Sequence, residues 1–256
     1  MRAHARVVAE ADGRGGTRLA QLRGETPLLL RRTGVAADLD AGWATEPLVG
    51  GAAGPLGGDD LRLDIDVGAG ARLSLRTVAA SIALPSRTGA PSHLNVRVTV
   101  AGGGTLHWLP EQTGAAADCR HTTAASVDAG EGATLLWRDE LVCGRHDEAP
   151  GDLTVSTSVT YAGRPLLRQR LDVGPGADGW AGPAVLGAAR ATGSLLHVHP
   201  GVAPGAPRVL GPTAVRVPLA GPASLTTATA PDAHALRQYL CLAAPEPAPV
   251  PLLRPP

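Results

Sequence analysis

Phenylalanine and lysine are absent from the 256 residues of this sequence. The two Tyr and four Trp bring the aromatic share to only 2%, although hydrophobic residues make up 44%. A core of this composition must be filled by Leu, Val and Ala, with tryptophan as an occasional large side chain. Without lysine, the chain cannot form a Walker A phosphate loop, a Schiff base on lysine or a lysine general base.

Cysteine is also scarce, and its spacing excludes the usual thiol sites. Cys119, Cys143 and Cys241 lie far apart and form no C-x-x-C pair, which excludes a zinc knuckle and a thioredoxin-like site. The formal net charge is zero, so we expect neither nucleic acid nor an anionic membrane as a partner. The first residues lack the apolar run of a signal peptide, and no stretch of about 18 apolar residues follows. We therefore expect a cytoplasmic protein.

The sequence is rich in alternation of apolar and polar residues. Leu61 to Val67 and Leu94 to Val100 both place apolar side chains at every second position, the pattern of half-buried strands. A glycine-marked turn followed by such alternation occurs four times, and the leucine after each turn serves as a marker. These leucines, spaced by 33, 29 and 31 residues, are Leu73, Leu106, Leu135 and Leu166.

A repeat of roughly 30 residues with two strands in each copy predicts stacked β-layers, because one layer cannot bury its apolar face alone. We therefore predict a mainly β fold made of stacked two-strand layers, similar to a β-helix. The alternative is a large β-sandwich built from an antiparallel meander, in which hairpins also recur.

Helical patterns are few. Gly182 to Gly193 has apolar residues three and four apart, and Pro231 to Leu242 begins with the capping residue Asp232. The sequence thus predicts about two short helices, one of them near the C-terminus. The glycine-rich stretch Glu46 to Asp60 predicts a loop. We expect one β domain over residues 1–243 and a proline-rich, extended or disordered tail over residues 244–256.

Patterns that would indicate an enzyme or a metal site are incomplete. The glycines before Asp59 lack the G-K-[ST] sequence and precede a strand, which argues against a phosphate site. No G-x-S-x-G motif occurs, and Cys143 has no oxyanion motif beside it. His197 and His199 stand two apart, so on a strand both point to one face and form a candidate metal pair. Because no third ligand lies nearby, we predict no firm metal site and no catalytic residue.

Paired carboxylates keep a hydrolase open as an alternative, since glycoside hydrolysis needs two of them and many β-helical proteins act on polysaccharides. The acidic residues that could supply such a pair are Asp59, Asp60, Glu111, Asp139 and Glu140. Sugar sites usually stack the sugar on aromatic rings, which are rare here. A third alternative is a structural β-repeat protein without chemistry of its own.

Short motifs in a fixed order run from about Thr26 to Leu240. The most specific are Gly57-Gly58-Asp59, Gly70-Ala71 with Thr77, Ala79 and Ala80, Trp108-Leu109-Pro110, and Glu140 with Gly144-Arg145. Each is short, but their order resembles the urease accessory protein family UreD, called UreH in some bacteria. The chain departs from that pattern at Ser81-Ile82-Ala83, over residues 111–119, and at Asp152, where a glutamate is usual.

The resemblance implies a mostly β fold with a few helices and a role without catalysis. Members of this family scaffold the assembly of the urease nickel centre. They dock the accessory proteins UreF and UreG on the urease apoenzyme and help to pass Ni²⁺ into it. The GTPase of that system is UreG, which agrees with the missing lysine and phosphate loop. The resemblance therefore implies Ni²⁺ as a transient cargo and no tightly bound cofactor.

The resemblance also singles out residues. Its motif positions are Gly58, Asp59, Trp108, Pro110, Gly144 and Arg145. A nickel relay needs a polar path rather than a tight site, because a closed site would hold the ion too firmly for release. We hypothesise that polar side chains in the best-matched strands line this path, namely Thr77, Glu111 and Glu140. The other interpretation is that these side chains cap turns or pair with arginine.

Overall fold

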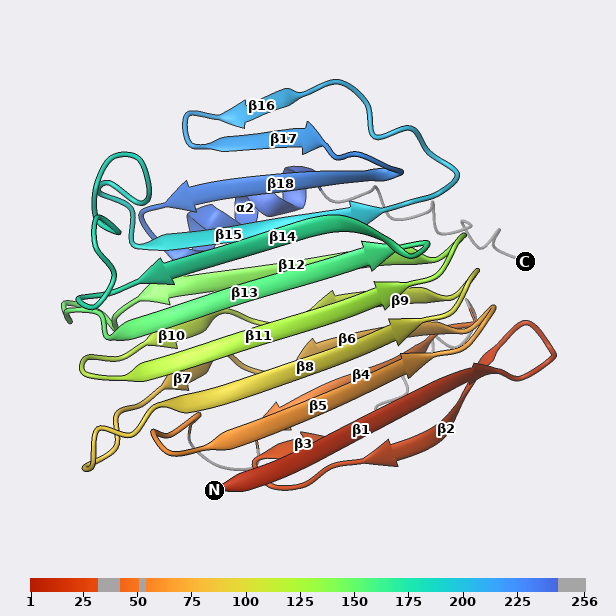
Figure 1. The fold of residues 1–256 in the computed structure, drawn as a ribbon, viewed down its shortest axis with the longest axis horizontal. Coiled ribbons are helices and arrows are strands. Elements are labelled where there is room, and N and C mark those ends of the chain that lie inside the picture. The colour runs from red at the N-terminus through yellow and green to blue at the C-terminus, as the bar shows by residue number, and fades with distance from the viewer. Residues whose placement is uncertain (32–41, 51–53, 244–256) are drawn as a thin grey trace, which may run out of the picture.

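The computed structural model describes residues 1–31, 42–50 and 54–243, which form two facing β-sheets and one helix (Figure 1). In spatial order, sheet A contains β14 (Arg164–Val173), β13 (Asp152–Tyr161), β11 (Arg120–Ala129), β8 (Ser92–Val100), β5 (Asp60–Val67), β1 (Arg2–Ala11) and β2 (Thr17–Arg23). The prediction of a mainly β fold is confirmed.

Sheet B is the larger sheet. In spatial order it contains β16 (Arg208–Gly211), β17 (Ala214–Pro218), β18 (Ala223–Ala230), β15 (Ala191–Val198), β12 (Thr134–Cys143), β9 (Thr105–Leu109), β6 (Arg72–Thr77), β4 (Ala44–Gly50) and β3 (Leu28–Leu30). The short strands β7 (Ser81–Ala83) and β10 (Thr113–Ala115) pair with each other, and β10 also pairs with β12. Helix α2 (Ala233–Ala243) packs against β15 and β18.

The chain builds the stack by alternating between the two sheets. Strands β5, β8 and β11 lie parallel in sheet A, and each is followed by β6, β9 or β12, which lie parallel in sheet B. The marker leucines stack in register, since Leu73 pairs with Leu106 and Leu106 pairs with Leu135. All three are fully buried. The predicted stack of two-strand layers is therefore confirmed for these three copies.

The fourth copy of the turn does not continue the stack. Leu166 lies on β14, which runs antiparallel to β13 within sheet A instead of crossing to sheet B. The turn between these strands explains the reversal, because Ala162 and Gly163 both have positive φ, 48° and 72°. Two such residues in succession are typical of a tight β-hairpin. The prediction that Leu166 marks a fourth layer is therefore wrong.

The core between the sheets is aliphatic, as the composition requires. Its buried residues are almost all Leu, Val, Ile and Ala, and two tryptophans supply the remaining volume. Trp108 on β9 and Trp137 on β12 lie in register and stack with ring centroids 5.3 Å apart. Both indoles are buried, so the Trp108-Leu109-Pro110 motif places a large side chain at the centre of the stack.

The helix predictions have different outcomes. Helix α2 forms near the C-terminus, where the Asp232 carboxylate caps it by accepting a hydrogen bond from the Ala235 backbone N–H at 2.8 Å. Residues 182–190 instead form a run of turns, so the helix predicted over 182–193 is wrong. Gly187 has a φ of +56°, which interrupts a helix, and Ala191 already belongs to β15.

The loop predicted over residues 46–60 is wrong in its first part. Residues 44–50 form β4, which pairs in parallel with β6 along the free edge of the stack. Residues 51–53 and the predicted proline-rich tail, 244–256, lie outside the described residues. No helix in the described part of the chain is long and apolar enough to span a membrane.

Candidate functional site

A cavity of about 460 Å³ lies between the two sheets, next to the stacked indoles. Sheet A forms one wall, mostly with apolar side chains but also with His121 and Thr123, and β6, β9 and β12 of sheet B form the other. The sequence-predicted positions that line it are Thr77, Trp108, Pro110, Glu111, Glu140 and Arg145. The fold thus brings together residues that are spread over about a quarter of the chain.

The mouth of the cavity is formed where the strands of sheet B end. The Thr77 hydroxyl donates to the Ala79 carbonyl at 3.0 Å and accepts a hydrogen bond from the Glu111 backbone N–H at 2.8 Å. Thr77 therefore fixes the segment that carries Glu111. The apolar residues Val78 and Ile82 also line the cavity and are exposed at its rim. Ile82 belongs to the segment in which the sequence departs from the UreD pattern.

Glu111 and Glu140 sit in a cluster of four charged residues. The Arg237 guanidinium of α2 binds both oxygens of Glu140 at 2.6 Å, through Nε and Nη2, and reaches Glu111 at 3.1 and 3.2 Å. Arg138 lies 3.3 Å from Glu140 and donates to the Pro110 carbonyl at 2.7 Å. The side chain of Glu140 is fully buried, whereas Glu111 is about one-third exposed.

These contacts shift the pKa values of three of the four residues. The hydrogen bond from Arg237 holds the pKa of Glu111 below its usual value, with further help from the charges of Arg138 and Arg76. The two carboxylates hold the pKa of Arg237 above its usual value, chiefly through the hydrogen bond to Glu140, against a smaller effect of burial. Burial lowers the pKa of Arg138, which its acidic neighbours partly offset. The interpretation that Glu111 and Glu140 pair with arginine is therefore confirmed, and both also line the cavity.

Asp139 faces the opposite side of β12 and points into the space between the sheets. One of its carboxylate oxygens, Oδ2, accepts hydrogen bonds from Trp137 Nε1 at 2.9 Å and from the Thr157 hydroxyl at 2.8 Å. No salt bridge joins this carboxylate to a basic side chain among the described residues. Burial therefore raises its pKa, and the two hydrogen bonds only partly oppose this effect.

Asp139 also lines a second, smaller space of about 20 Å³, which is room for one water molecule. The polar residues around this space are Asp139, Thr157, Gln169, Thr192 and Ser194. The oxygen Oε1 of Gln169 is buried and has no hydrogen-bond partner among the described residues. Because Asp139 and Val155 line both the cavity and this small space, the two lie next to each other.

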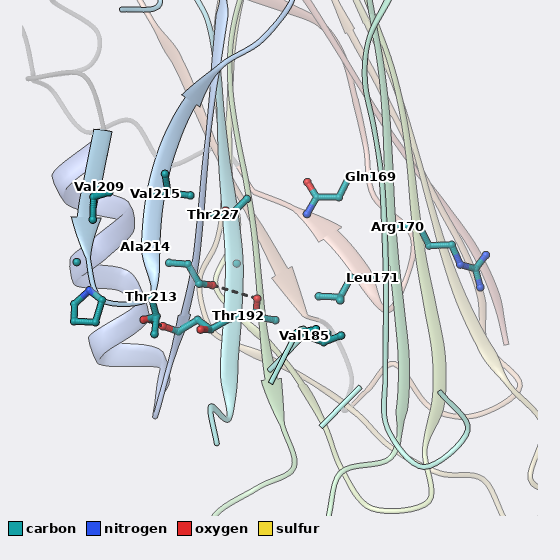
Figure 2. A pocket seen from close by; sticks show the side chains of 16 residues that line it. Gln169, Arg170, Leu171, Val185, Thr192, Val209, Thr213, Ala214, Val215 and Thr227 are labelled. Atoms are coloured by element: carbon teal, nitrogen blue, oxygen red, sulfur yellow. Dashed lines mark hydrogen bonds between the residues drawn. The ribbon is translucent and has the colours of Figure 1, made fainter. Parts of the chain in front are cut away.

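A groove of about 480 Å³ continues from the small space to the surface. It lies between β14, the last strand of sheet A, and the inner face of β15, β18 and β17, which extend beyond it. Figure 2 shows Gln169 and Leu171 pointing across this groove toward Thr192 and Thr227, while Arg170 points away. Gln169 and Thr192 line both spaces. The small space therefore adjoins both the cavity and the groove.

The Gly144-Arg145 motif shapes the turn at the edge of the cavity. Gly144 has a φ of +78°, and a Cβ atom there would lie 2.4 Å from the Glu148 carbonyl oxygen, so only glycine fits. Arg145 binds the Glu148 carboxylate through Nε at 2.9 Å and Nη2 at 2.5 Å. These hydrogen bonds lower the pKa of Glu148 to about 2. Arg145 therefore closes a local turn as well as lining the cavity.

The Gly58-Asp59 motif has a structural role away from the cavity wall. Gly58 has a φ of +92° in the turn before β5. The buried Asp59 accepts a hydrogen bond from the Leu56 backbone N–H at 2.9 Å and lies 2.6 Å from the amino nitrogen of Met1. The segment leads into β5, without a helix N-terminus that could bind phosphate.

The two candidate metal residues lie side by side, but no cluster forms around them. The rings of His197 and His199 are 5.5 Å apart, with His197 on β15 and His199 just after its end. Within residues 1–31, 42–50 and 54–243, no group of three or more His, Cys, Asp and Glu side chains is arranged to hold a metal ion. Burial lowers the pKa of His197, with help from the charges of His199 and Arg216.

Two of the three cysteines are unsuited to nucleophilic chemistry. Cys119 and Cys143 are buried, and burial raises the pKa of each thiol to about 11. Both thiols therefore stay protonated near neutral pH, and neither is a ready nucleophile or metal ligand.

Comparison with known proteins decides the family. The model of the UreD urease accessory protein family matches residues 1–243. This chain belongs to the UreD family. It is 49% identical to urease accessory protein UreD 3 of Streptomyces griseus over 247 residues, which cover 94% of both chains. It is 48% identical to UreD of Streptomyces coelicolor, again over 94% of both chains, and 43% identical to UreD of Frankia alni over 94% of this chain and 91% of that one.

Membership of the UreD family confirms the resemblance seen in the sequence motifs. Sequence reasoning missed Arg237, the residue that joins Glu111 and Glu140, and it considered Asp139 only as a possible hydrolase carboxylate. Arg237 lies 97 residues from Glu140 and sits on an amphipathic helix, where an arginine next to buried leucines is ordinary. For Asp139 a signal exists in the sequence, because it stands two and four residues after the inward-facing Trp137 and Leu135 and so shares their face of the strand.

Proposed function

We propose that this UreD family member is a non-catalytic scaffold for the assembly of the urease nickel centre in the cytoplasm. In this role it docks UreF and UreG on the urease apoenzyme, and it helps to convey Ni²⁺ as a transient cargo. The observation that carries the proposal is the UreD match over residues 1–243, together with a cavity that gathers the predicted path residues Thr77, Glu111 and Glu140.

The geometry supports a conduit better than a storage site. Ni²⁺ bound by several imidazole, thiolate or carboxylate groups would be released slowly. In the described part of the chain, no three such groups converge. The polar groups are instead spread along the cavity, the small space and the groove, with Asp139 between the first two. Oxygen atoms spaced in this way give a cation weak, successive contacts, and the sheets shield it from thiols and from imidazoles other than that of His121.

Each part of the path has a role in this proposal. Glu111 and Glu140 supply carboxylates at the mouth, and Thr77 positions the segment of Glu111. Asp139 provides the carboxylate at the narrow part, where its neutral hydrogen-bond donors leave its charge uncompensated. The exposed apolar residues Val78 and Ile82 at the rim suit a contact with a partner protein that continues the path.

The first experiment is co-expression of the tagged chain with UreF, UreG and the urease subunits of the same organism. Copurification identifies the partners, and urease activity in low nickel with and without this gene tests whether maturation depends on it. We expect UreF to copurify and urease activity to be lost on deletion.

A chain that purifies alone, beside a urease that matures normally without it, would contradict the proposal. The same preparation separates the alternatives, since a hydrolase would turn over a polysaccharide without any partner. A structural β-repeat protein would show neither turnover nor an effect on urease.

A further inference from the structure

Helix α2 holds the two mouth carboxylates from outside the cavity. Arg237 uses Nε and Nη2 to bind the two oxygens of Glu140, and Nη1 and Nη2 to bind those of Glu111. All four carboxylate oxygens are thus engaged by one guanidinium. Both glutamates also line the cavity, whereas Arg237 does not, so the guanidinium binds their carboxylates from the α2 side of sheet B.

The helix is attached to sheet B through one face. Leu236 and Leu240 are its buried residues, and they belong to an apolar cluster separate from the main core between the sheets. Two glycines of sheet B give the helix room. A Cβ on Gly193 would lie 3.3 Å from Leu236, and one on Gly211 would lie 2.4 Å from the ring of Tyr239. The opposite face, with His234 and Gln238, is exposed.

We propose that α2 is a latch on the nickel path. With α2 seated, Arg237 keeps Glu111 and Glu140 closed to a divalent cation. With α2 lifted, Arg138 is the remaining salt-bridge partner of both carboxylates among the described residues, at 3.7 Å from Glu111 and 3.3 Å from Glu140. The carboxylates then become available to Ni²⁺ at the mouth of the cavity. This inference rests on the proposed function, because it describes how the proposed path is regulated.

The chemistry of the latch also specifies what opens it. When Arg237 leaves the two carboxylates, its guanidinium needs another anion, because a desolvated charge without a partner costs free energy. A partner protein that presents an aspartate or glutamate to Arg237 meets this need with the same bidentate geometry. The latch therefore opens on docking of an acidic protein surface over α2, which couples release of the cation to assembly of the complex.

The test measures binding of Ni²⁺ alone to the purified full-length chain by equilibrium dialysis near pH 7.5. Arg237→Gln removes the internal cation, and we expect it to bind one additional Ni²⁺ at least about tenfold more tightly than the unaltered chain, a typical coupling. The double variant R237Q/E140Q should lose this gain, which separates the site from adventitious binding to the eight histidines. Arg164→Gln, an exposed arginine on β14, is the matched control and should bind like the unaltered chain.

Equal Ni²⁺ binding by folded R237Q and the unaltered chain would overturn the latch. Circular dichroism and a thermal melt establish folding. If R237Q does not fold, Arg237→Lys replaces it, because lysine keeps the charge and loses the fork. For R237K we expect a smaller increase in Ni²⁺ affinity than for R237Q. An affinity equal to that of the unaltered chain would again overturn the latch. Failure of the proposed function is a separate result, since it appears as normal urease maturation in cells that lack this chain.

Discussion

Asp139 and Glu140 are neighbours in the sequence, yet they lie in opposite environments on the two faces of β12. Asp139 faces the space between the sheets, and two neutral donors, Trp137 and Thr157, share one of its oxygens. Glu140 faces α2, and two guanidinium groups, from Arg138 and Arg237, compensate its charge. Glu140 is buried and Asp139 is half-buried, and the larger difference between them lies in their partners.

The state of a carboxylate taken out of solvent in this fold depends on whether its hydrogen-bond donors are neutral or charged. Where neutral groups bind it, the charged form is disfavoured and the pKa rises, as for Asp139. Where arginine binds it, as for Glu140, both carboxylate oxygens are occupied by the guanidinium. In the proposed path, the first condition gives an acid that a cation binds by displacing its proton, and the second closes a carboxylate until its partner leaves.

The largest effect expected from this comparison is the loss of stability in Glu140→Gln. The substitution leaves Arg138 and Arg237 without the buried anion that both bind, and breaking such a pair typically costs about 3–5 kcal/mol. The free energy of unfolding from urea titration measures it. The matched control is Glu131→Gln in an exposed turn, expected within about 0.5 kcal/mol of the unaltered chain. A similar small effect for E140Q would contradict the account of the cluster.

Gly193→Ala should have the next largest effect, because it crowds the face of β12 that carries Glu140 and on which α2 packs. Its Cβ would lie 2.7 Å from the Asp139 carbonyl oxygen and 3.3 Å from both Glu140 and Leu236. We expect a loss of about 1–3 kcal/mol, typical of overpacking, and faster hydrogen exchange of the α2 amides.

The control for this substitution is Gly114→Ala on β10, where the nearest atom to an added Cβ is 3.8 Å away. Gly114→Ala should leave the hydrogen-exchange rates of the α2 amides unchanged. If G193A exchanges like the unaltered chain, α2 does not depend on its seat on β15.

Asp139→Asn should act in the opposite direction from E140Q and stabilise the chain at neutral pH. Both hydrogen bonds reach Oδ2, and the Asn oxygen can accept them in the same place. Because the native pKa lies above the unfolded value of 3.8, the unfolded state loses its proton first. The native state therefore loses stability as the pH rises from about 3.8 through the native pKa, and Asn is free of this loss.

Urea titrations of D139N and the unaltered chain from pH 3.5 to 7 measure the difference. The two curves should meet at the acid end and separate as the pH rises. A D139N chain that is less stable than the unaltered chain at pH 7 would contradict a raised pKa of Asp139.

The smallest effect concerns the exposed pair at the rim. The pKa of Glu148, about 2, depends first on the side chain of Arg145 and second on its backbone N–H. Arg145→Gln removes the first contribution and keeps the second, so the pKa should rise only part of the way to 4.5. The stabilising contribution of the pair is present above about pH 4.5 and is lost as the pH falls toward 2. Carboxyl NMR titration gives the pKa directly, and an unchanged value would contradict the assigned cause.

The sequence predicted the parallel layers because their turns and leucines repeat in register. It did not predict the hairpin at Ala162-Gly163, since an alanine with positive φ has no local signal and the leucine after the turn looks like the others. Strand β4 was missed for another reason. Its pairing with β6 comes from the free edge of the stack, while its own sequence lies beside a run of glycines.

The site could be predicted only as far as local motifs reach. Thr77 and Glu140 belong to motifs of the UreD pattern, Glu111 directly follows one, and the fold places all three on one cavity. The partner that binds both carboxylates comes from α2, more than 90 residues further along the chain. Long-range pairing of this kind is decided by the packing of the helix on Gly193 and Gly211, which no spacing in the sequence reveals.

The measurement that tests the central claim most directly is the nickel content of urease matured beside a chain with a blocked cavity. Thr123→Trp places an indole in the cavity, whereas Ser126→Trp places it on the exposed face of the same strand. Both variants are co-expressed with UreF, UreG and urease, and both must be folded and retained in the complex. We expect urease to lose most of its nickel with T123W and to keep it with S126W. A full complement of nickel with T123W would show that the ion does not pass between the sheets.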